Sequence, residues 1–416
     1  MKELMRVKLF IVAVPLFSPD MSVEAYYLQY RSGEKLFGIM DDHTALDGAM
    51  NSPGLDIINE VGVEPFTGGK ALTVPINKFT LISDFTAAIK TPPELLVFAL
   101  PRDLPAEPMF LDRCVALKKA GYRFAIPDER LTAKTAALYD LADCIMFDAS
   151  DGGYLDRLKE TRTRYPYMRA VFLNVDDNEK FGSLKLFSNS LYEGRFYKNP
   201  ITKGARRITP IKANALHLLK IMSDEDFSLE EISNVISRDA ALSIALLKFI
   251  NSPTIGIRNK VSSIKNAIAL LGQKETGKWI MACVSMYIAE DKPSEITKLS
   301  LTRAKFMENL ATAFEMGIHA PSLFLMGLFS LLDVILDKPM PEALKEISVT
   351  DKIREALAEG RGEFAKVLEL VYAYERADWK EVSRLMIIHN VDANKLYAAF
   401  FDSLVWYRNL LKSIDE

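Results

Sequence analysis

The chain has 416 residues, of which 49% are hydrophobic and 26% are charged, and its formal net charge is -3. This composition is typical of a globular protein and excludes a disordered or collagen-like chain. The length favours two or three domains, and the nearly balanced charge gives no broad attraction to nucleic acid, so we expect no nucleic-acid partner.

The first half of the sequence alternates short β-rich runs with helical patterns. This alternation is typical of βα units around a parallel sheet, and several runs are apolar throughout, as expected of strands buried on both faces. We therefore predict a TIM-like (β/α) barrel, with some antiparallel irregularity near its start. The expected strands are residues 9–17, 25–31, 71–77, 95–101, 122–127, 144–149, 170–175 and 193–197.

The second half, after a turn-rich stretch at residues 199–210, carries helical signals only. Ser228 and Glu231 have the spacing of a capping box, and Thr350 is placed to begin another helix. The apolar residues between 393 and 414 recur at helical spacing, which predicts a final helix with one buried face. We expect a domain at residues 1–200 and an all-helical domain at residues 201–416.

The cysteines and the N-terminus indicate a cytoplasmic protein. Cys114, Cys144 and Cys283 are too scattered for a disulfide framework or a CxxC metal site. The first 20 residues imitate a signal peptide, but Pro15 interrupts the apolar run and no small-x-small cleavage site follows. No other apolar segment approaches the roughly 20 residues that a membrane-spanning helix needs, so we expect no membrane partner.

Four strings in the first half resemble an EAL domain, the barrel family that hydrolyses the bacterial messenger cyclic di-GMP. They are AYYLQYRSG (25–33), KKAGYRFAIPDE (118–129), ALYDLADCIMFD (137–148) and LYEGRFYKNP (191–200). The resemblance implies a barrel of EAL type with its site at the carboxyl ends of the strands.

A longer string in the second half resembles the HDOD domain, an all-helical relative of the HD phosphohydrolases that is regarded as a noncatalytic signalling module. The string is SRDAALSIALLKFINSPTIGIRNKVSSIKNAIALLGQKE, residues 237–275. Together the two resemblances cover nearly the whole chain and point to EAL-HDOD two-domain signalling proteins. The His-Asp dyad of HD hydrolases falls at Ser330 and Leu331, which implies that this dyad is lost.

Hydrolysis of a phosphodiester at a barrel mouth requires several carboxylates that hold divalent cations. By the resemblance, most of the family's functional positions carry other residue types here. The positions that we expect to be degenerate are Tyr27, Ala99, Pro127, Met146 and Glu193. The residues that remain as a possible ligand-binding set are Arg31, Asn77, Asp128 and Asp148, with Asp176 near a further metal-ligand position. We therefore predict no metal site.

Two acidic pairs allow a plainer interpretation than metal binding. Asp148 and Asp151 could form a residual metal site at the end of a strand, but a loop that caps the next helix is favoured. Asp176 and Asp177 are followed by Asn178 and Glu179, which also favours the N-terminus of a helix.

The sequence thus predicts a protein that is not an enzyme, has no cofactor and acts by binding other signalling proteins. The resemblance implies outputs such as motility or biofilm control, and a homodimer is compatible with either domain. A first alternative is a receptor that binds cyclic di-GMP without cutting it, supported by Arg31 and opposed by the charge of Glu193. A second is a residual metal-dependent phosphodiesterase that uses Asn77, Asp128 and Asp148.

Overall fold

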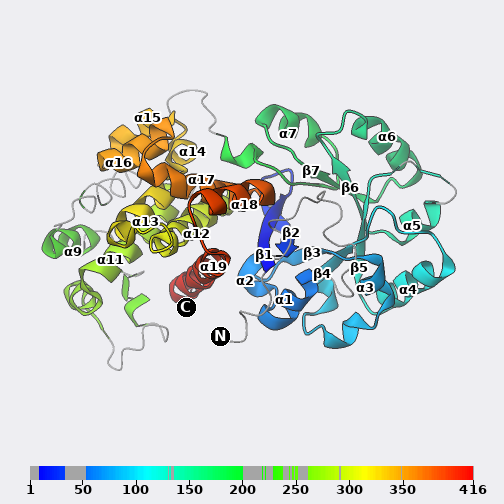
Figure 1. Cartoon of the computed structure of the whole chain (residues 1–416), viewed down its shortest axis with the longest axis horizontal. Coiled ribbons are helices and arrows are strands. Elements are labelled where there is room, and N and C mark those ends of the chain that lie inside the picture. The colour runs from blue at the N-terminus through cyan, green and yellow to red at the C-terminus, as the bar shows by residue number, and fades with distance from the viewer. Residues whose placement is uncertain are drawn as a thin grey trace. The chain divides into compact units, whose positions relative to one another are not determined.

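The computed structural model describes residues 9–32, 53–129, 131–132, 135–199, 228–237, 261–289, 292–347 and 349–415, with a few isolated positions between 218 and 251. The chain divides into two compact units (Figure 1). The first comprises Met1–Asn199 and Ala373–Arg384, and the second comprises Pro200–Tyr372 and Leu385–Glu416. The first unit thus includes a segment from the C-terminal half of the sequence.

The first unit is a closed barrel in which neighbouring strands follow the order of the chain from β1 to β8. The strands are β1 (Leu9–Phe17), β2 (Val23–Ser32), β3 (Ala71–Pro75), β4 (Leu96–Ala99), β5 (Arg123–Pro127), β6 (Cys144–Asp148), β7 (Arg169–Leu173) and β8 (Ser190–Tyr192). Strands β2 to β8 are parallel, whereas β1 is antiparallel to both of its neighbours. The prediction of a TIM-like barrel with an antiparallel start is confirmed.

The helices of this unit lie around the outside of the strands (Figure 1). Helix α4 begins at Pro108, whose ring suits the first turn, and ends just before Gly121, which adopts a φ of 95°. The helices and 3-10 turns are α1 (Pro53–Val61), α2 (Glu64–Thr67), α3 (Lys78–Ile82), η4 (Phe85–Ala88), η5 (Pro93–Leu95), α4 (Pro108–Lys119), α5 (Ala136–Leu141), α6 (Tyr154–Arg164), α7 (Asn178–Leu184) and η6 (Phe196–Lys198).

The last strand differs from its prediction. The sequence favours residues 193–197, but β8 ends at Tyr192 and Phe196–Lys198 form a 3-10 turn. The reason lies at Gly194, which has a φ of 149° and passes so close to the backbone of Val175 that any side chain would overlap it. The strand therefore stops before an aromatic run that looks β-forming on its own.

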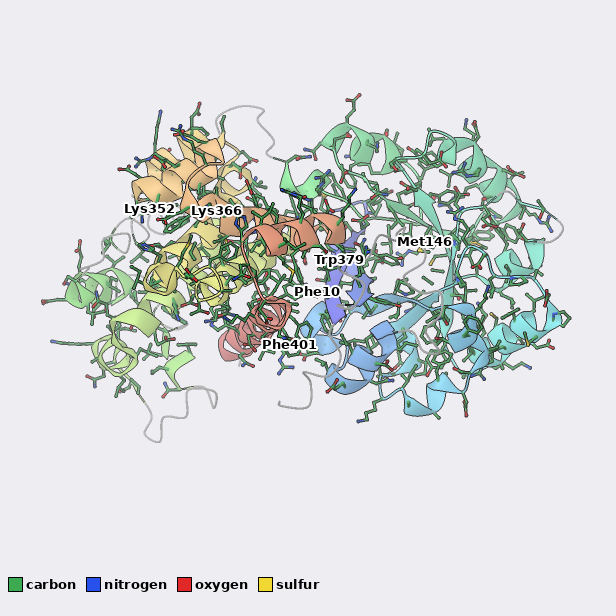
Figure 2. The ribbon with its side chains drawn as sticks, viewed as in Figure 1. Phe10, Met146, Lys352, Lys366, Trp379 and Phe401 are labelled. Atoms are coloured by element: carbon green, nitrogen blue, oxygen red, sulfur yellow. The ribbon has the colours of Figure 1, made fainter. Side chains whose placement is uncertain are left out.

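The interior of the barrel is filled by apolar side chains from several strands. One buried cluster consists of Val97, Ala99 and Ala125, with Tyr27 and Met146 packed against it; Met146 is labelled in Figure 2. A second cluster at the β7–β8 side also contacts Tyr27 and Met146. These two residues thus join the clusters into a packed core, as is usual for small barrels.

The segment Ala373–Arg384 packs against β1. Phe10 of β1 has its ring centroid 6.1 Å from that of Tyr374 and 6.3 Å from that of Trp379 (Figure 2). The hydroxyl of Tyr374 donates to the carbonyl of Ile11 at 3.4 Å. All three rings are buried, and aromatic groups of this size contribute much of the energy of a core. The segment is therefore part of the hydrophobic core of the barrel unit.

The second unit is helical in its described part, so the prediction of an all-helical domain is confirmed there. Ser228 accepts from the backbone of Glu231, and Thr350 accepts from Ile353, as the capping patterns predict. The elements are α9 (Leu229–Ser237), α11 (Ile264–Ile288), α12 (Ser294–Leu310), η7 (Gly317–His319), α13 (Ala320–Phe329), α14 (Leu332–Leu336), α15 (Met340–Ala343), η8 (Leu344–Glu346), α16 (Asp351–Arg354), the π-turn η9 (Glu355–Glu359), α17 (Glu363–Glu375), α18 (Trp379–Ile388) and α19 (Ala393–Asp415).

Helices α12 and α13 pack at very close range. A β-carbon on Gly327 would lie 2.6 Å from the Cα atom of Ala304, so only glycine fits at this crossing. The hydroxyl of Ser300 donates to the carbonyl of Leu328 at 2.7 Å across the same contact. Much of the HDOD-like string at residues 237–275 lies outside the described residues.

Replacement of Trp379 tests whether the returning segment belongs to the barrel. We expect Trp379→Ala to destabilise the barrel by about 3–5 kcal/mol, the usual cost of deleting a large buried aromatic side chain. Amide hydrogen exchange should show lost protection in Leu9–Phe17. The exposed neighbour gives the control Lys380→Ala, which should leave protection unchanged. Unaltered exchange of this strand in Trp379→Ala would contradict the assignment.

Candidate functional site

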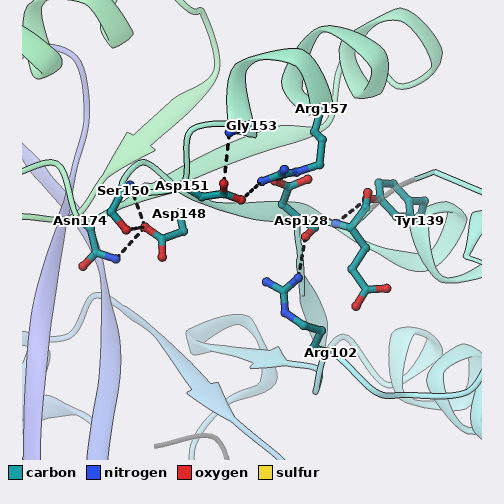
Figure 3. Close-up of polar contacts among 10 residues, drawn as sticks. Arg102, Asp128, Tyr139, Asp148, Ser150, Asp151, Gly153, Arg157 and Asn174 are labelled. Atoms are coloured by element: carbon teal, nitrogen blue, oxygen red, sulfur yellow. Dashed lines mark hydrogen bonds and ion pairs between the residues drawn. The ribbon is translucent and has the colours of Figure 1, made fainter.

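A cluster of polar side chains lies where β5, β6 and β7 end (Figure 3). Asp128 follows β5, Asp148 is the last residue of β6, and Asn174 follows β7. Because β2 to β8 run parallel, their carboxyl ends share one rim, which is where barrels of this architecture carry their functional groups. We call this end the rim.

Asp128 is the most buried carboxylate of the rim. Its side chain is only 2% exposed, and its Oδ2 atom accepts a 2.6 Å hydrogen bond from Nε of Arg157. Its backbone carbonyl accepts from Nη1 of Arg102 at 3.1 Å. Burial raises the pKa of Asp128, and the hydrogen bond and charge of Arg157 oppose this only in part. Two arginines therefore fix this residue.

Arg157 joins two acidic residues from different segments. While its Nε atom contacts Asp128, its Nη2 atom donates to Oδ2 of Asp151 at 2.5 Å. Asp151 in turn accepts from the backbone of Gly153 at 3.1 Å, just before α6 begins. The arginine thus ties the β6–α6 loop to the end of β5.

Asp148 is held by three hydrogen bonds. Its Oδ1 atom accepts from the amide of Asn174 at 2.8 Å and from the hydroxyl and backbone of Ser150 at 2.6 and 2.9 Å. Burial acts to raise the pKa of Asp148, but these hydrogen bonds together lower it. The prediction that this loop caps the next helix is wrong in detail. Asp148 and Asp151 accept hydrogen bonds from residues within the loop. The N-cap residue of α6 is Gly153, which has no side chain that could cap the helix.

Asn174 connects Asp148 to Glu193. It adopts a left-handed φ of 60°, which asparagine tolerates better than most residues. Its backbone N–H donates to Oε2 of Glu193 at 3.0 Å. Burial raises the pKa of Glu193, and burial together with the charge of Glu193 raises the pKa of Tyr27 to about 12. Tyr27 is therefore a neutral phenol at physiological pH.

The acidic pair after β7 has two separate roles. Asp177 caps α7 by accepting from the backbone of Lys180 at 2.6 Å, as the sequence predicts. Asp176 instead forms a 2.9 Å ion pair with Arg195. The hydrogen bond from Arg195 lowers the pKa of Asp176.

The structure brings together three of the positions that the resemblance marks as degenerate. Tyr27, Ala99 and Met146 belong to the same interior cluster. Pro127 ends β5 and pairs with Met146. The charge of Glu193 acts on Tyr27, which belongs to this cluster, and helps to raise its pKa. The corresponding part of the rim is therefore mostly apolar.

Arg31 and Asn77 lie at the carboxyl ends of two other strands, β2 and β3. Arg31 is buried on β2, opposite Phe10 and four residues beyond Tyr27. Because strand side chains alternate, Arg31 shares the inward face of β2 with Tyr27. Asn77 caps α3, since its side-chain oxygen accepts from the backbone of Thr80 at 2.7 Å.

The position expected for a lost His-Asp dyad lies in the helical unit beside a buried arginine. Nη1 of Arg303 donates to the hydroxyl of Ser330 at 2.6 Å, and its guanidinium lies 4.8 Å from the ring of Tyr372. Leu331 is buried. A guanidinium and a hydroxyl therefore occupy this part of the helical core.

The donor set of the rim does not fit a resident divalent cation in this arrangement. In the described part of the chain, no group of three or more histidine, cysteine, aspartate or glutamate side chains could hold a metal ion. Asp128 and Asp176 have arginine partners, and Asp148 has an asparagine partner. Divalent cations need several converging oxygens, and here those oxygens are engaged with other groups.

Three residues of the rim were not identified from the sequence. Arg102 is exposed, and its charge acts on Asp128, Glu129 and Asp148. Arg157 and Asn174 were also missed. Arg102 follows a predicted strand, Asn174 lies next to the last residue of one, and Arg157 lies in the first turns of a helix after one. Barrel topology favours such positions for functional groups. Their position relative to the predicted strands was the signal in the sequence that could have identified them.

Comparisons with known proteins identify the helical part. Residues 208–363 match the model of the HDOD domain. The chain contains an HDOD domain. The uncharacterized protein YuxH of Bacillus subtilis (strain 168) is 29% identical over 419 residues, which cover 97% of this chain and 99% of YuxH. In the described part of the chain, no helix is long and apolar enough to span a bilayer.

Two further proteins are similar to the chain. The cyclic di-GMP phosphodiesterase CdgJ of Vibrio cholerae serotype O1 (strain ATCC 39315 / El Tor Inaba N16961) is 22% identical, over 97% of this chain and 94% of CdgJ. The crystal structure of an EAL domain protein from Listeria monocytogenes EGD-e is 14% identical with a TM-score of 0.37, over 47% of this chain and 90% of that protein.

One prediction from the sequence is overturned by these comparisons. The chain was expected not to be an enzyme, because several family positions carry other residues. CdgJ, which aligns with nearly the whole chain, is named as an enzyme. Residue types at single motif positions were therefore too weak a basis for that prediction.

Replacement of Glu193 should change how stability depends on pH. A carboxyl whose pKa is raised in the fold destabilises the protein when it is ionised, so this penalty is complete above the raised pKa and absent below the ordinary glutamate pKa of about 4.3. Glu193→Gln should thus raise the unfolding midpoint at pH 8, and the gain should shrink as the pH falls toward 5. The exposed residue Glu179 provides the control Glu179→Gln. A gain that is equal at both pH values would contradict this account.

Proposed function

We propose that the chain is a cyclic di-GMP signalling protein, in which the barrel rim binds the nucleotide and the HDOD-containing unit passes the event on. The observation that carries the proposal is the alignment with CdgJ over 97% of this chain, because it includes both the barrel and the HDOD domain. The rim carries arginine side chains, and their guanidinium groups can bind the phosphates of such a ligand.

Arginines at the rim suit a phosphodiester. Arg102 is exposed, its Nη1 atom donates to the carbonyl of Asp128, and its charge acts on three carboxylates of the cluster. Arg31 lies on the inward face of β2. A planar guanidinium can donate two parallel hydrogen bonds to phosphate oxygens. We assign the phosphate contacts to Arg102 and Arg31.

Isothermal titration of the full chain with cyclic di-GMP tests this assignment. We expect Arg102→Gln to weaken binding about ten- to hundredfold, since a hydrogen bond to a charged group contributes roughly 1.5–3 kcal/mol. Arg164 ends α6, at the opposite end of the barrel from the rim, and Arg164→Gln is the matched control. The proposal fails if the parent chain does not bind, or if both variants bind as the parent does.

Hydrolysis of the bound nucleotide is a second candidate function, favoured by the name of CdgJ and by two aspartates of the rim, one directly after β5 and one at the end of β6. We expect release of the linear dinucleotide in the presence of Mn²⁺ and its loss in Asp148→Asn. The control is Asp156→Asn, because Asp156 is exposed on α6. If the parent chain binds the nucleotide but releases no linear product at any Mn²⁺ concentration, this second candidate is wrong while the first remains.

The helical unit is the part that we propose to act on other signalling proteins. It contains the HDOD domain. In its core, the guanidinium of Arg303 contacts Ser330, one of the two positions at which the sequence predicts that the metal-binding dyad is lost. Self-association stays a prediction that sedimentation of the full chain can check.

A further inference from the structure

Two arginines lie at the end of the barrel opposite the rim, where the parallel strands begin. We call this end the amino end. Arg123 begins β5 and Arg169 begins β7. Ala125 and Val171, two residues further along these strands, belong to the interior clusters. Because side chains alternate along a strand, Arg123 and Arg169 share the inward face with them.

Cys144 of β6 lies between the two arginines. It is paired with Arg169 on one side and with Ala125, two residues after Arg123, on the other. Burial and the charge of Asp143 raise the pKa of the Cys144 thiol to about 12, whereas the charges of Arg169 and Arg123 act in the opposite direction. Both guanidinium groups therefore lie within electrostatic reach of one point at the amino end.

Each of these arginines has a buried donor without an acceptor. Within the described residues, Nε of Arg123 and Nε of Arg169 are buried and have no hydrogen-bond partner. Every loop that leads into a strand at the amino end belongs to those residues. An unpaired buried donor costs free energy, so such an atom in a native protein calls for an acceptor. Two such donors on the same inward face indicate an acceptor from outside the chain.

The charges at the amino end leave a positive excess. Nη2 of Arg123 donates to the carbonyl of Glu94 at 2.6 Å, and no carboxylate of the described residues pairs with this arginine. Nη2 of Arg169 lies 2.5 Å from Oε2 of Glu24. Asp143 is already compensated by a lysine of α4, whose Nζ atom lies 2.9 Å away. Two guanidinium groups thus share one carboxylate, which favours a ligand with negative charge.

We propose that the amino end of the barrel binds a small tetrahedral oxyanion, either free phosphate or the phosphate group of a monoester, between Arg123 and Arg169. Neighbouring strands lie about 4.8 Å apart, so donors from β5 and β7, with β6 between them, approach the ligand from two sides. A tetrahedral anion presents oxygens in several directions, whereas a carboxylate presents both oxygens in one plane. Hydrogen bonds from guanidinium to phosphate are charge-assisted and strong.

Titration of the full chain with inorganic phosphate, at constant ionic strength, tests this site. We expect the parent to bind with a dissociation constant below about 1 mM. Arg123→Gln and Arg169→Gln should each bind at least tenfold more weakly, because each loses a charged donor. The control is Arg164→Gln, since Arg164 is exposed at the same end of the barrel, where α6 ends. Equal losses in all three variants would overturn the proposal.

Replacement of Glu24 gives a test of opposite sign that keeps both arginines, so it stays decisive if the arginine variants fail to fold. Glu24→Gln removes the carboxylate that competes for Nη2 of Arg169 and should tighten phosphate binding at least threefold. The control Glu179→Gln removes an exposed negative charge at the start of α7 and should leave binding unchanged. Equal tightening in both variants would show a general effect of charge and overturn the site.

Arg102→Gln separates the amino end from the rim. We expect this variant to bind inorganic phosphate as the parent does. If Arg102→Gln loses phosphate binding while Arg123→Gln keeps it, the anion binds at the rim and the proposed site is overturned. That outcome does not contradict the proposed function, which titration with cyclic di-GMP tests by itself.

Titration with glycerol phosphate distinguishes the two sources of the anion. Tighter binding of the ester assigns the site to a phosphomonoester, and tighter binding of inorganic phosphate assigns it to the free ion. Either result supports the site, provided that Arg123→Gln weakens it. If neither compound binds the parent, water satisfies the two Nε donors and the proposal is overturned.

Discussion

Closure of the barrel is the constraint on which the rest of the first unit depends. Each strand pairs with the next, and the reversed β1 completes the ring by pairing with both β2 and β8. Closure leaves no exposed sheet edge and places the carboxyl ends of β2 to β8 on one rim. Residues as distant in sequence as Arg102, Asp128 and Asn174 become neighbours for this reason alone.

The charges of the rim are arranged in pairs. Asp128 faces Arg157, Asp176 faces Arg195, and Asp148 accepts hydrogen bonds from Asn174 and Ser150. Burial of a carboxylate is tolerated when a cation or donor compensates it. A divalent cation at the rim must therefore compete with groups that already occupy these oxygens.

The two halves of the sequence are not two independent folding units in succession. The chain passes from one compact unit to the other after Asn199, after Tyr372 and after Arg384. The segment between the last two points buries Tyr374 and Trp379 against Phe10 of the barrel. A truncated chain that ends near residue 200 would lack part of the barrel's core. The HDOD match at residues 208–363 ends before this segment begins.

The sequence by itself determined the class of each half and most of the strands. Apolar runs bounded by turn residues identify buried strands, and capping patterns such as Thr350 identify helix starts, because both signals are local. The sequence placed the last strand wrongly, since the contact of Gly194 with Val175 is between distant segments.

Only the tertiary structure decided how the side chains of the rim are paired. Arg157 was not singled out from the sequence because its partners are distant from it in the chain or in a loop: Asp128 follows β5, and Asp151 lies between β6 and α6. The role of Trp379 in the barrel was hidden for the same reason. Pairings of this kind depend on the closed barrel, because closure brings together side chains that are far apart in the sequence. A local pattern of residues carries no information about such pairs.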